Sequence, residues 1–179
     1  MIEVASTARL SFRLLGAEDK ELLFELDQDP EVMKYINGGK MTTMKDVEEV
    51  YLPRLASYSS PEKGWGMWGV FVKNNEDFIG WILVRPMEFF SENPEFDNLE
   101  LGWRFKRSSW GNGYGTEAAK AVMDAVGEPD DVKRLSAVAM LGNEASVNIM
   151  KKLGMEYIKT YTHKDPLGDI EAVYYSLEC

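Results

Sequence analysis

The chain has 179 residues and a mass of 20.3 kDa, with 45% hydrophobic residues, which is enough to bury one core, so we expect residues 1–179 to form a single domain. Thirty acidic against 20 basic residues give a net charge of −10, the wrong sign for a nucleic-acid binder or an anionic-membrane binder. No apolar stretch reaches the ~18 residues of a membrane helix, and the single cysteine, Cys179, excludes a disulfide framework and a cysteine-based metal site within the chain. We therefore expect a cytoplasmic protein with cationic partners, although an acidic surface can also serve solubility alone.

The first third of the chain predicts a strand followed by two helices. Residues 8–15, ARLSFRLL, alternate as in a half-buried strand. An acidic pair, Glu18 and Asp19, then begins a helix that Asp29–Pro30 ends. Thr43 and Asp46 resemble a capping box that opens a second helix, in which a proline predicts a kink or a restart at position 53.

The middle of the chain predicts a hairpin, a loop and a third strand. WGMWGVFVK (65–73) and FIGWILVR (78–85) flank the polar turn NNED, which is typical of a hairpin. Residues 86–98 mix prolines, acids and phenylalanines and indicate a long functional loop. LELGWRF (99–105) alternates again.

The last third predicts two helices, one strand and a final hairpin. TEAAKAVMDAV (116–126) is helical, RLSAVAML (134–141) is a short strand, and Asn143 can cap a helix that continues through Lys152. MEYIKTYTH and IEAVYYSLE flank a KDPLGD turn. Six or seven strands with about four helices describe a mixed α/β (α+β) domain.

A glycine-rich loop, RSSWGNGYGTEA (107–118), stands between a predicted strand and a predicted helix. Free N–H groups at a helix start hold phosphate, and glycines let the ligand approach, so the context favours phosphate binding over a plain tight turn. The spacing Gly113-x-Gly115-x-x-Ala118 also fits a dinucleotide fingerprint, but too little chain follows it and the next strand ends without an acid. A P-loop is excluded because Thr116 and Glu117 stand where it needs Lys and Ser or Thr.

The segment LGWRFKRSSWGNGYGTEAAKAV resembles motif A of the GNAT (Gcn5-related N-acetyltransferase) superfamily, whose (Arg/Gln)-x-x-Gly-x-(Gly/Ala) loop wraps the pyrophosphate of acetyl-coenzyme A. The pattern falls on Trp110, Gly113 and Gly115, and Trp in the first position is typical of the RimJ/RimL-type branch. ARLSFRLLGAEDKELL, EDFIGWILV and NEASVNIMKKLGM resemble further segments of that branch, in the right order. The resemblance covers nearly the whole chain.

The resemblance implies an acyl-CoA N-acyltransferase fold, with a six- to seven-stranded, mostly antiparallel mixed sheet and a central splayed parallel pair at 98–106 and 133–140. It implies acetyl-CoA as cosubstrate and no metal. It places the pantetheine arm between the splayed strands. The cofactor-binding residues it implies are Phe105, Arg107, Trp110, Gly111, Asn112, Gly113, Tyr114, Gly115, Thr116, Asn143 and Ser146. For Asn143 an ordinary helix cap is the alternative, and for Arg107 a solvated surface position.

Acyl transfer to an amine needs a proton acceptor, and the resemblance makes Glu100 the first candidate, acting through a water; a surface ion pair is its alternative. The position of the superfamily's usual tyrosine acid is Met150 here, so the acid candidates are Ser146 and a tyrosine of the terminal hairpin. We expect His163 to be solvated.

We expect the tryptophans and the pair Phe89–Phe90 to be mostly core. Trp68, Phe89 and Phe90 are also candidate walls of an acceptor pocket, with nearby acids attracting a cationic amine. The resulting hypothesis is an N-acetyltransferase acting on a peptide N-terminal amine or a small-molecule amine, working as a monomer or homodimer. Two alternatives are a non-catalytic acyl-CoA-binding sensor or scaffold and, more remotely, a different nucleotide-binding module.

Overall fold

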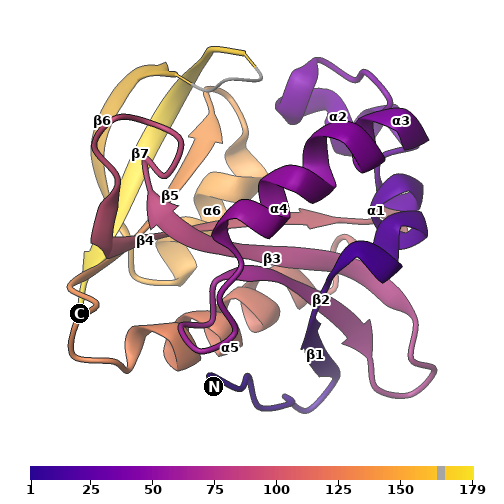
Figure 1. Cartoon of the computed structure of the whole chain (residues 1–179), viewed down its shortest axis with the longest axis horizontal. Helices are drawn as coiled ribbons and strands as arrows, with labels where there is room; N and C mark the ends of the chain where they lie inside the picture. Colours follow the sequence, from indigo (N-terminus) through magenta and orange to yellow (C-terminus); the bar gives the residue numbers. More distant parts are fainter. Residues whose placement is uncertain (165–167) are drawn as a thin grey trace.

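The computed structural model describes residues 1–164 and 168–179. Within those residues one seven-stranded sheet crosses the molecule in the order β1-β2-β3-β4-β5-β7-β6 (Figure 1). All neighbouring strands are antiparallel except the central pair, β4 and β5. The strands are β1 (Leu10–Leu14), β2 (Gly66–Val72), β3 (Phe78–Met87), β4 (Glu95–Phe105), β5 (Arg134–Met140), β6 (Glu156–His163) and β7 (Ile170–Glu178).

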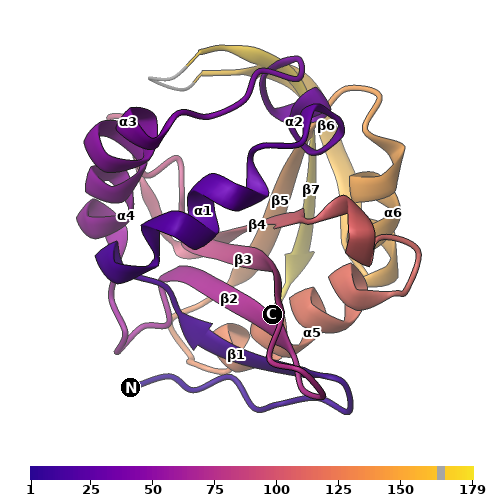
Figure 2. The ribbon, with the colours of Figure 1, turned by 90° about the vertical axis from the view of Figure 1, so that its right-hand side faces the viewer.

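Five helical segments of the described chain cover the two faces of this sheet (Figure 2). On one face lie α1 (Lys20–Leu26), α2 (Pro30–Asn37) and a longer segment made of α3 (Met44–Asp46), the π-helical turn Val47–Tyr51 and α4 (Leu52–Tyr58). On the other face lie α5 (Tyr114–Gly127) and α6 (Glu144–Lys152). No helix of the described residues is long and apolar enough to cross a membrane.

The parallel pair at the centre of the sheet separates after a short contact. β4 pairs with β5 only from Asn98, opposite Arg134, to Glu100, opposite Ser136. Beyond that point β4 stays bonded to β3 and β5 stays bonded to β7, so the two strands diverge toward their carboxyl ends. The predicted mixed sheet with a central splayed pair is therefore confirmed, and the gap between these strands positions the site described below.

Local capping explains where several helices begin. Thr43 and Asp46 form the predicted reciprocal capping box, and the Asn143 side chain accepts the N–H of Ser146 at the start of α6, as expected. Pro53 lies in the first turn of α4, where the chain restarts an α-helix after the π-helical turn. Each cap supplies partners for N–H groups that a helix start otherwise leaves unpaired.

Three boundary predictions were wrong. The first helix ends at Leu26, before Asp29–Pro30, and this pair begins α2 instead, because the Asp29 side chain accepts the N–H of Glu31 and proline fits the first helical position. The loop predicted at 86–98 is shorter, since β3 runs to Met87 and β4 begins at Glu95. The helix after the glycine loop starts at Tyr114 instead of Thr116. Residues 165–167 of the predicted KDPLGD turn lie outside the described residues.

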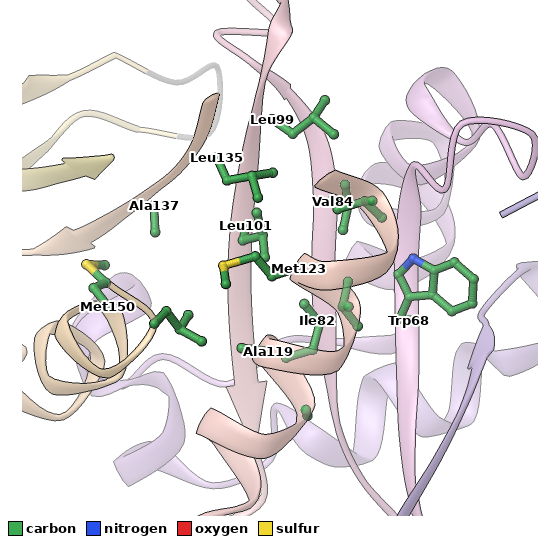
Figure 3. Close-up of a cluster of buried hydrophobic side chains, with 14 of the residues drawn as sticks. Trp68, Ile82, Val84, Leu99, Leu101, Ala119, Met123, Leu135, Ala137 and Met150 are labelled. Carbon is green, nitrogen blue, oxygen red and sulfur yellow. The ribbon is translucent and has the colours of Figure 1, made fainter. Parts of the chain in front are cut away.

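Two hydrophobic cores hold the helices onto the sheet. The core under α5 and α6 includes Leu101 from β4, Met123 from α5 and Met150 from α6 (Figure 3). The core under α1 to α4 is separate and includes Met33 of α2 and Leu83 of β3. Side chains of β3 alternate between the two cores, as the period of a strand requires, whereas the core residues of β4 all belong to the core under α5 and α6.

Candidate active site

A pocket of about 500 Å³ lies where β4 and β5 diverge. Residues of α2 line it from one side, and α6 with the start of α5 lines it from the other. It therefore joins the two faces of the sheet through the gap. The predicted cofactor residues that line it are Phe105, Trp110, Gly111, Gly113, Tyr114, Gly115, Thr116, Asn143 and Ser146.

The glycine loop has the backbone that its composition predicts. Gly111 and Gly113 have φ angles of 79° and 77°, in the left-handed region that side chains disfavour. Gly113 is the N-cap of α5, and no side chain caps this helix. Its first-turn N–H groups and the positive end of the helix dipole are therefore available to a phosphate.

Gly115 has a different reason to be glycine. It lies inside the first turn of α5, and a Cβ at this position would stand 3.0 Å from Cδ1 of Ile149 on α6. That distance is shorter than ordinary van der Waals contact, so the missing side chain lets α6 approach the start of α5. The glycine thus shapes the pocket by bringing two of its walls together.

Two predicted cofactor residues, Arg107 and Asn112, do not line the pocket. The Arg107 guanidinium pairs with Asp29, with Nε 2.8 Å from Oδ2. The Asn112 amide donates to the main-chain oxygens of Ser109 and Trp110, at 2.9 and 3.2 Å. Both side chains bind protein groups that fix the loop, and their role in coenzyme binding stays a prediction.

The Ser146 hydroxyl is the second predicted catalytic group, and it lies at the first turn of α6. Its oxygen accepts the indole N–H of Trp103, at 3.2 Å. Met150, one turn further along α6, is only 1% exposed and belongs to the core. A residue at position 150 therefore points away from the pocket, and Ser146 is the side chain of this helix that combines a hydroxyl with a place in the lining.

Glu100 lies on the other face of β4, outside the lining of the pocket. It is 9% exposed and pairs with Arg85 of β3, with Nε 3.4 Å from Oε2 and Nη2 3.5 Å from Oε1. Burial raises the pKa of the nearby Tyr58 to about 12, with Arg85 lowering it and Glu100 raising it. The ion-pair alternative for Glu100 is thus realised, and the pair is largely shielded from solvent.

Phe89 and Phe90 lie beside this ion pair. Their rings contact Tyr58, with centroids at 5.9 and 6.3 Å, and the Arg85 guanidinium stands 5.3 Å from the Phe90 ring. Their positions agree with a wall around Glu100 on the face of α1 to α4. This aromatic group and the ion pair are termed the acceptor-side cluster below.

Trp68 does not belong to this cluster, which corrects the expectation for it. It is 4% exposed and lies in the core under α5, where Figure 3 shows it among residues of the opposite face. Its indole N–H donates to the main-chain oxygen of Gly64, at 3.0 Å. Residues 67 and 69 face the other way, because successive strand side chains alternate between faces.

The sequence did not predict the wall that α2 contributes. Glu31, Lys34 and Tyr35 of this helix line the pocket. The combination of an N-cap aspartate with a proline at the first helical position was the signal that could have revealed it. Trp103 was also missed, although its position two residues before Phe105 places both on one face of β4.

Tyr161 is the hairpin tyrosine on which the carboxylate of Glu100 has a resolved electrostatic influence. Burial raises its pKa, and the carboxylates of Glu88 and Glu100 raise it further. Its hydroxyl hydrogen-bonds with Nδ1 of His163, at 2.9 Å, so the single histidine has a protein partner. Within the described residues no group of three or more His, Cys, Asp or Glu side chains is arranged to hold a metal ion.

A family model for the acetyltransferase (GNAT) domain matches residues 9–156. The chain is 31% identical over 161 residues to the FsC-acetyl coenzyme A-N(2)-transacetylase of Aspergillus fumigatus, covering 88% of this chain and 67% of that protein. It is also 31% identical over 158 residues to the uncharacterized protein YkkB of Bacillus subtilis, covering 86% of each.

Solved structures share the fold at lower identity. An acetyltransferase of the GNAT family from Bacillus anthracis superimposes with a TM-score of 0.75 at 23% identity, covering 99% of this chain and 98% of that one. The aminoglycoside acetyltransferase AAC(6′)-Ib in complex with coenzyme A gives 0.75 at 20% identity, covering 94% of both chains. RimL, the ribosomal L7/L12 alpha-N-protein acetyltransferase, gives 0.74 at 12% identity, covering 98% and 97%.

The matched region contains the glycine loop, both splayed strands and the first turn of α6, which are the parts that build the pocket. The fold is the acyl-CoA N-acyltransferase fold expected from the resemblance. The chain thus belongs to the GNAT family and is an acetyl-CoA-dependent acetyltransferase.

Proposed function

We propose that this protein transfers the acetyl group of acetyl-CoA to a primary amine, either a peptide or protein N-terminal amine or a small-molecule amine. The amine nitrogen attacks the thioester carbon directly in a ternary complex. A C–N bond forms, the C–S bond breaks, the thiolate leaves with the bonding electrons, and the amine loses one proton. The observation that carries the proposal is the pocket at the point where β4 and β5 diverge, lined by the glycine loop and by Ser146.

The donor occupies the side of the glycine loop in this proposal. The free N–H groups at the start of α5 bind the diphosphate, while Phe105 and Asn143 lie along the arm that leads into the gap. Arg107 and Asn112 hold the loop in shape. The gap suits an extended arm because both strands have one unpaired side there.

The proton leaves the amine through a water to Glu100, which is buried but lies outside the lining of the pocket. A relay is required because Glu100 does not line the pocket, and the carboxylate oxygens that Arg85 contacts keep lone pairs for a water. Ser146 hydrogen-bonds the departing thiolate. Since a thiol has a pKa near about 8.5, the thiolate can leave without receiving a full proton.

The acceptor lies against Phe89 and Phe90 in this proposal. Half-buried aromatic rings beside buried charges suit a ligand that carries both an apolar part and a cationic amine. The named acetyltransferases among the relatives and fold neighbours use aminoglycosides, an FsC N(2) amine or a ribosomal-protein N-terminus. Trp110 in the loop and the fold likeness to RimL favour the RimJ/RimL-type branch.

The proposal extends to the domain organisation, location and oligomeric state of the protein. Residues 1–179 form one domain, because a single sheet supports both hydrophobic cores. The net charge of −10 and the lone cysteine agree with a cytoplasmic enzyme that binds no nucleic acid and works as a monomer or homodimer.

Two features favour a second candidate, an acyl-CoA-binding sensor or scaffold without turnover. Met150 stands in the core at the position of the superfamily's usual tyrosine, and Arg85 occupies both oxygens of the candidate base. The two candidates differ in whether thiol is released when an amine is present.

The deciding experiment incubates the protein with acetyl-CoA and a panel of amines and N-terminal peptides, following thiol release, while calorimetry measures binding of acetyl-CoA. Saturable binding with release for one class of amine supports the enzyme and names its acceptor. Saturable binding with no release across the panel supports the sensor. No saturable binding overturns both candidates.

A further inference from the structure

Trp103 and Ser146 bridge the gap between the splayed strands. Trp103 lies on β4 beyond its last pairing with β5, and Ser146 lies at the start of α6, which follows β5. Both residues line the pocket, and the indole Nε1 donates to Ser146 Oγ at 3.2 Å. This side-chain bond joins the two halves of the site where no strand pairing does.

The bond decides which way the serine proton points. An indole N–H can only donate, so the Ser146 oxygen must be the acceptor. Among the residues that the structure describes, no atom accepts the Ser146 O–H, and the Ser146 main-chain N–H is bonded to Asn143 Oδ1 at 3.3 Å. With one lone pair held by Trp103 on one side, the O–H is left to donate into the pocket.

We propose that Trp103 is a positioning residue, which turns the Ser146 O–H toward the sulfur of the coenzyme. The proposal rests on the proposed function, in which that sulfur leaves as a thiolate. Ser146 keeps its proton and stabilises the thiolate by a hydrogen bond, and the thiol proton is taken from water when CoA departs. No covalent bond to the protein forms or breaks in this step.

The predicted signature is the pKa of the thiol of bound CoA. A donor directed at the sulfur stabilises the thiolate over the thiol, so this pKa falls below the free value near about 8.5. Losing a hydrogen bond to a charged group raises it again by roughly one unit. Substituting a residue that only packs against the coenzyme changes the affinity for the thiol and the thiolate of CoA equally, and so leaves the pKa of the bound thiol unchanged.

The experiment titrates CoA bound to four proteins and reads thiolate absorbance, with the titration of each protein alone subtracted to remove Cys179. The proteins are the wild type, Trp103→Phe, Ser146→Ala and the double variant. We expect each single variant to raise the pKa of bound CoA by roughly one unit, and the double variant to match Ser146→Ala. Ser146→Thr, which keeps the hydroxyl, is expected to stay near the wild-type value.

The inference is overturned if CoA bound to Trp103→Phe has the wild-type thiol pKa. It is also overturned if the pKa shift in the double variant equals the sum of the shifts in Trp103→Phe and Ser146→Ala. Circular dichroism and the melting temperature of each variant identify one that has simply lost its fold, in which case Trp103→His, which keeps a ring N–H, replaces it and is expected to retain the wild-type pKa. Amine acetylation by the wild type is measured in parallel. If the wild type acetylates no amine, the proposed function is overturned. The thiol titration still decides whether Trp103 directs the Ser146 hydroxyl.

Discussion

The Nε atom of Arg107 lies 2.8 Å from Oδ2 of Asp29, so the start of the glycine loop is tied to the N-cap residue of α2. The same Asp29 carboxylate accepts the N–H of Glu31 and caps that helix. The Asp29 side chain thus bonds to two walls of the pocket, the glycine loop and α2. The connection gives the missed helix a role in shaping the donor site.

Replacing Asp29 by alanine removes the helix cap and the ion pair together. We expect Asp29→Ala to lower the free energy of unfolding by about 1 kcal/mol, the usual cost of losing an aspartate cap, and to raise the KM for acetyl-CoA. Urea unfolding and steady-state kinetics measure the two effects. Arg107→Gln is the matched control, since it breaks only the exposed ion pair and should change stability by less. Equal losses in both variants would contradict the capping role.

The glycine loop gives a second prediction, at Gly113. Its φ of 77° means that any side chain costs about 1 kcal/mol of backbone strain, and here the strain falls on the amides that we propose bind the diphosphate. We expect Gly113→Ala to weaken acetyl-CoA binding in calorimetry by at least roughly fivefold. Gly154→Ala carries the same kind of strain, with φ of 88°, at the end of α6, and should leave the affinity unchanged. Similar affinities for both variants would remove the loop from the donor site.

Glu100→Gln tests the proposed base. We expect kcat to fall by roughly 10²-fold or more, because the amide cannot accept a proton, while the affinity for acetyl-CoA is unchanged. Glu95→Gln on the same strand, which also disrupts an ion pair, with Arg134, is the control and should keep most of the turnover. Unchanged turnover in Glu100→Gln would limit Glu100 to its ion pair with Arg85.

The two faces of the sheet predict opposite effects for two aromatic substitutions. Trp68→Phe removes the indole bond to Gly64 in the core, so we expect a loss of about 1–2 kcal/mol in stability and no change in the KM for the amine. Phe90→Leu alters the acceptor-side cluster and should raise that KM while lowering stability less. A change of the amine KM in Trp68→Phe would show that the acceptor reaches the other core.

Acid stability should depend on Asp19. Hydrogen bonds from Arg13 lower the pKa of this carboxyl, and the main-chain N–H of Gly16 lowers it further. A carboxyl with a depressed folded-state pKa stabilises the fold above its unfolded pKa of about 3.9, and the contribution is lost as the pH falls through the folded value. The wild type should exceed Asp19→Asn by about 1–2 kcal/mol at neutral pH, and the difference should shrink below about pH 4.

Urea unfolding at several pH values between neutral and acidic measures this dependence. Asp124→Asn is the control, because its pair with Lys120 is exposed on α5 and should contribute little at any pH. A difference between wild type and Asp19→Asn that persists unchanged in acid would mean that the carboxylate charge is not what stabilises the turn at Gly16.

Sequence patterns predicted the sheet and the donor side of the site because those features are local. Alternation located each strand, and the glycines at 111 and 113 carried their own signal, a backbone that only glycine adopts without strain. The cap at Asn143 was equally readable, since the donor it accepts is three residues away. Trp110 could be placed beside the pocket by its position in the loop.

The remaining features depend on contacts between distant segments. The sequence leaves Arg107 between a phosphate contact and a solvated position, and its pair with Asp29, which lies far away in the sequence, cannot be predicted from the local pattern. Trp68 looked like a pocket wall because alternation gives two faces without saying which one is the core under α5. Asp29–Pro30 fits the end of one helix and the start of another, and the local sequence does not distinguish them.

The short contact between β4 and β5 gives this protein two internal sheet margins, each a row of backbone groups bonded on one side only. At the outside of a protein such a row invites pairing with a foreign chain and, in the end, aggregation. Here both rows face each other in a crevice walled by α2 and α6, away from the outer edges of the sheet. An extended ligand with amide groups of its own can occupy the crevice, and its amides could then hydrogen-bond the unpaired backbone groups of both strands.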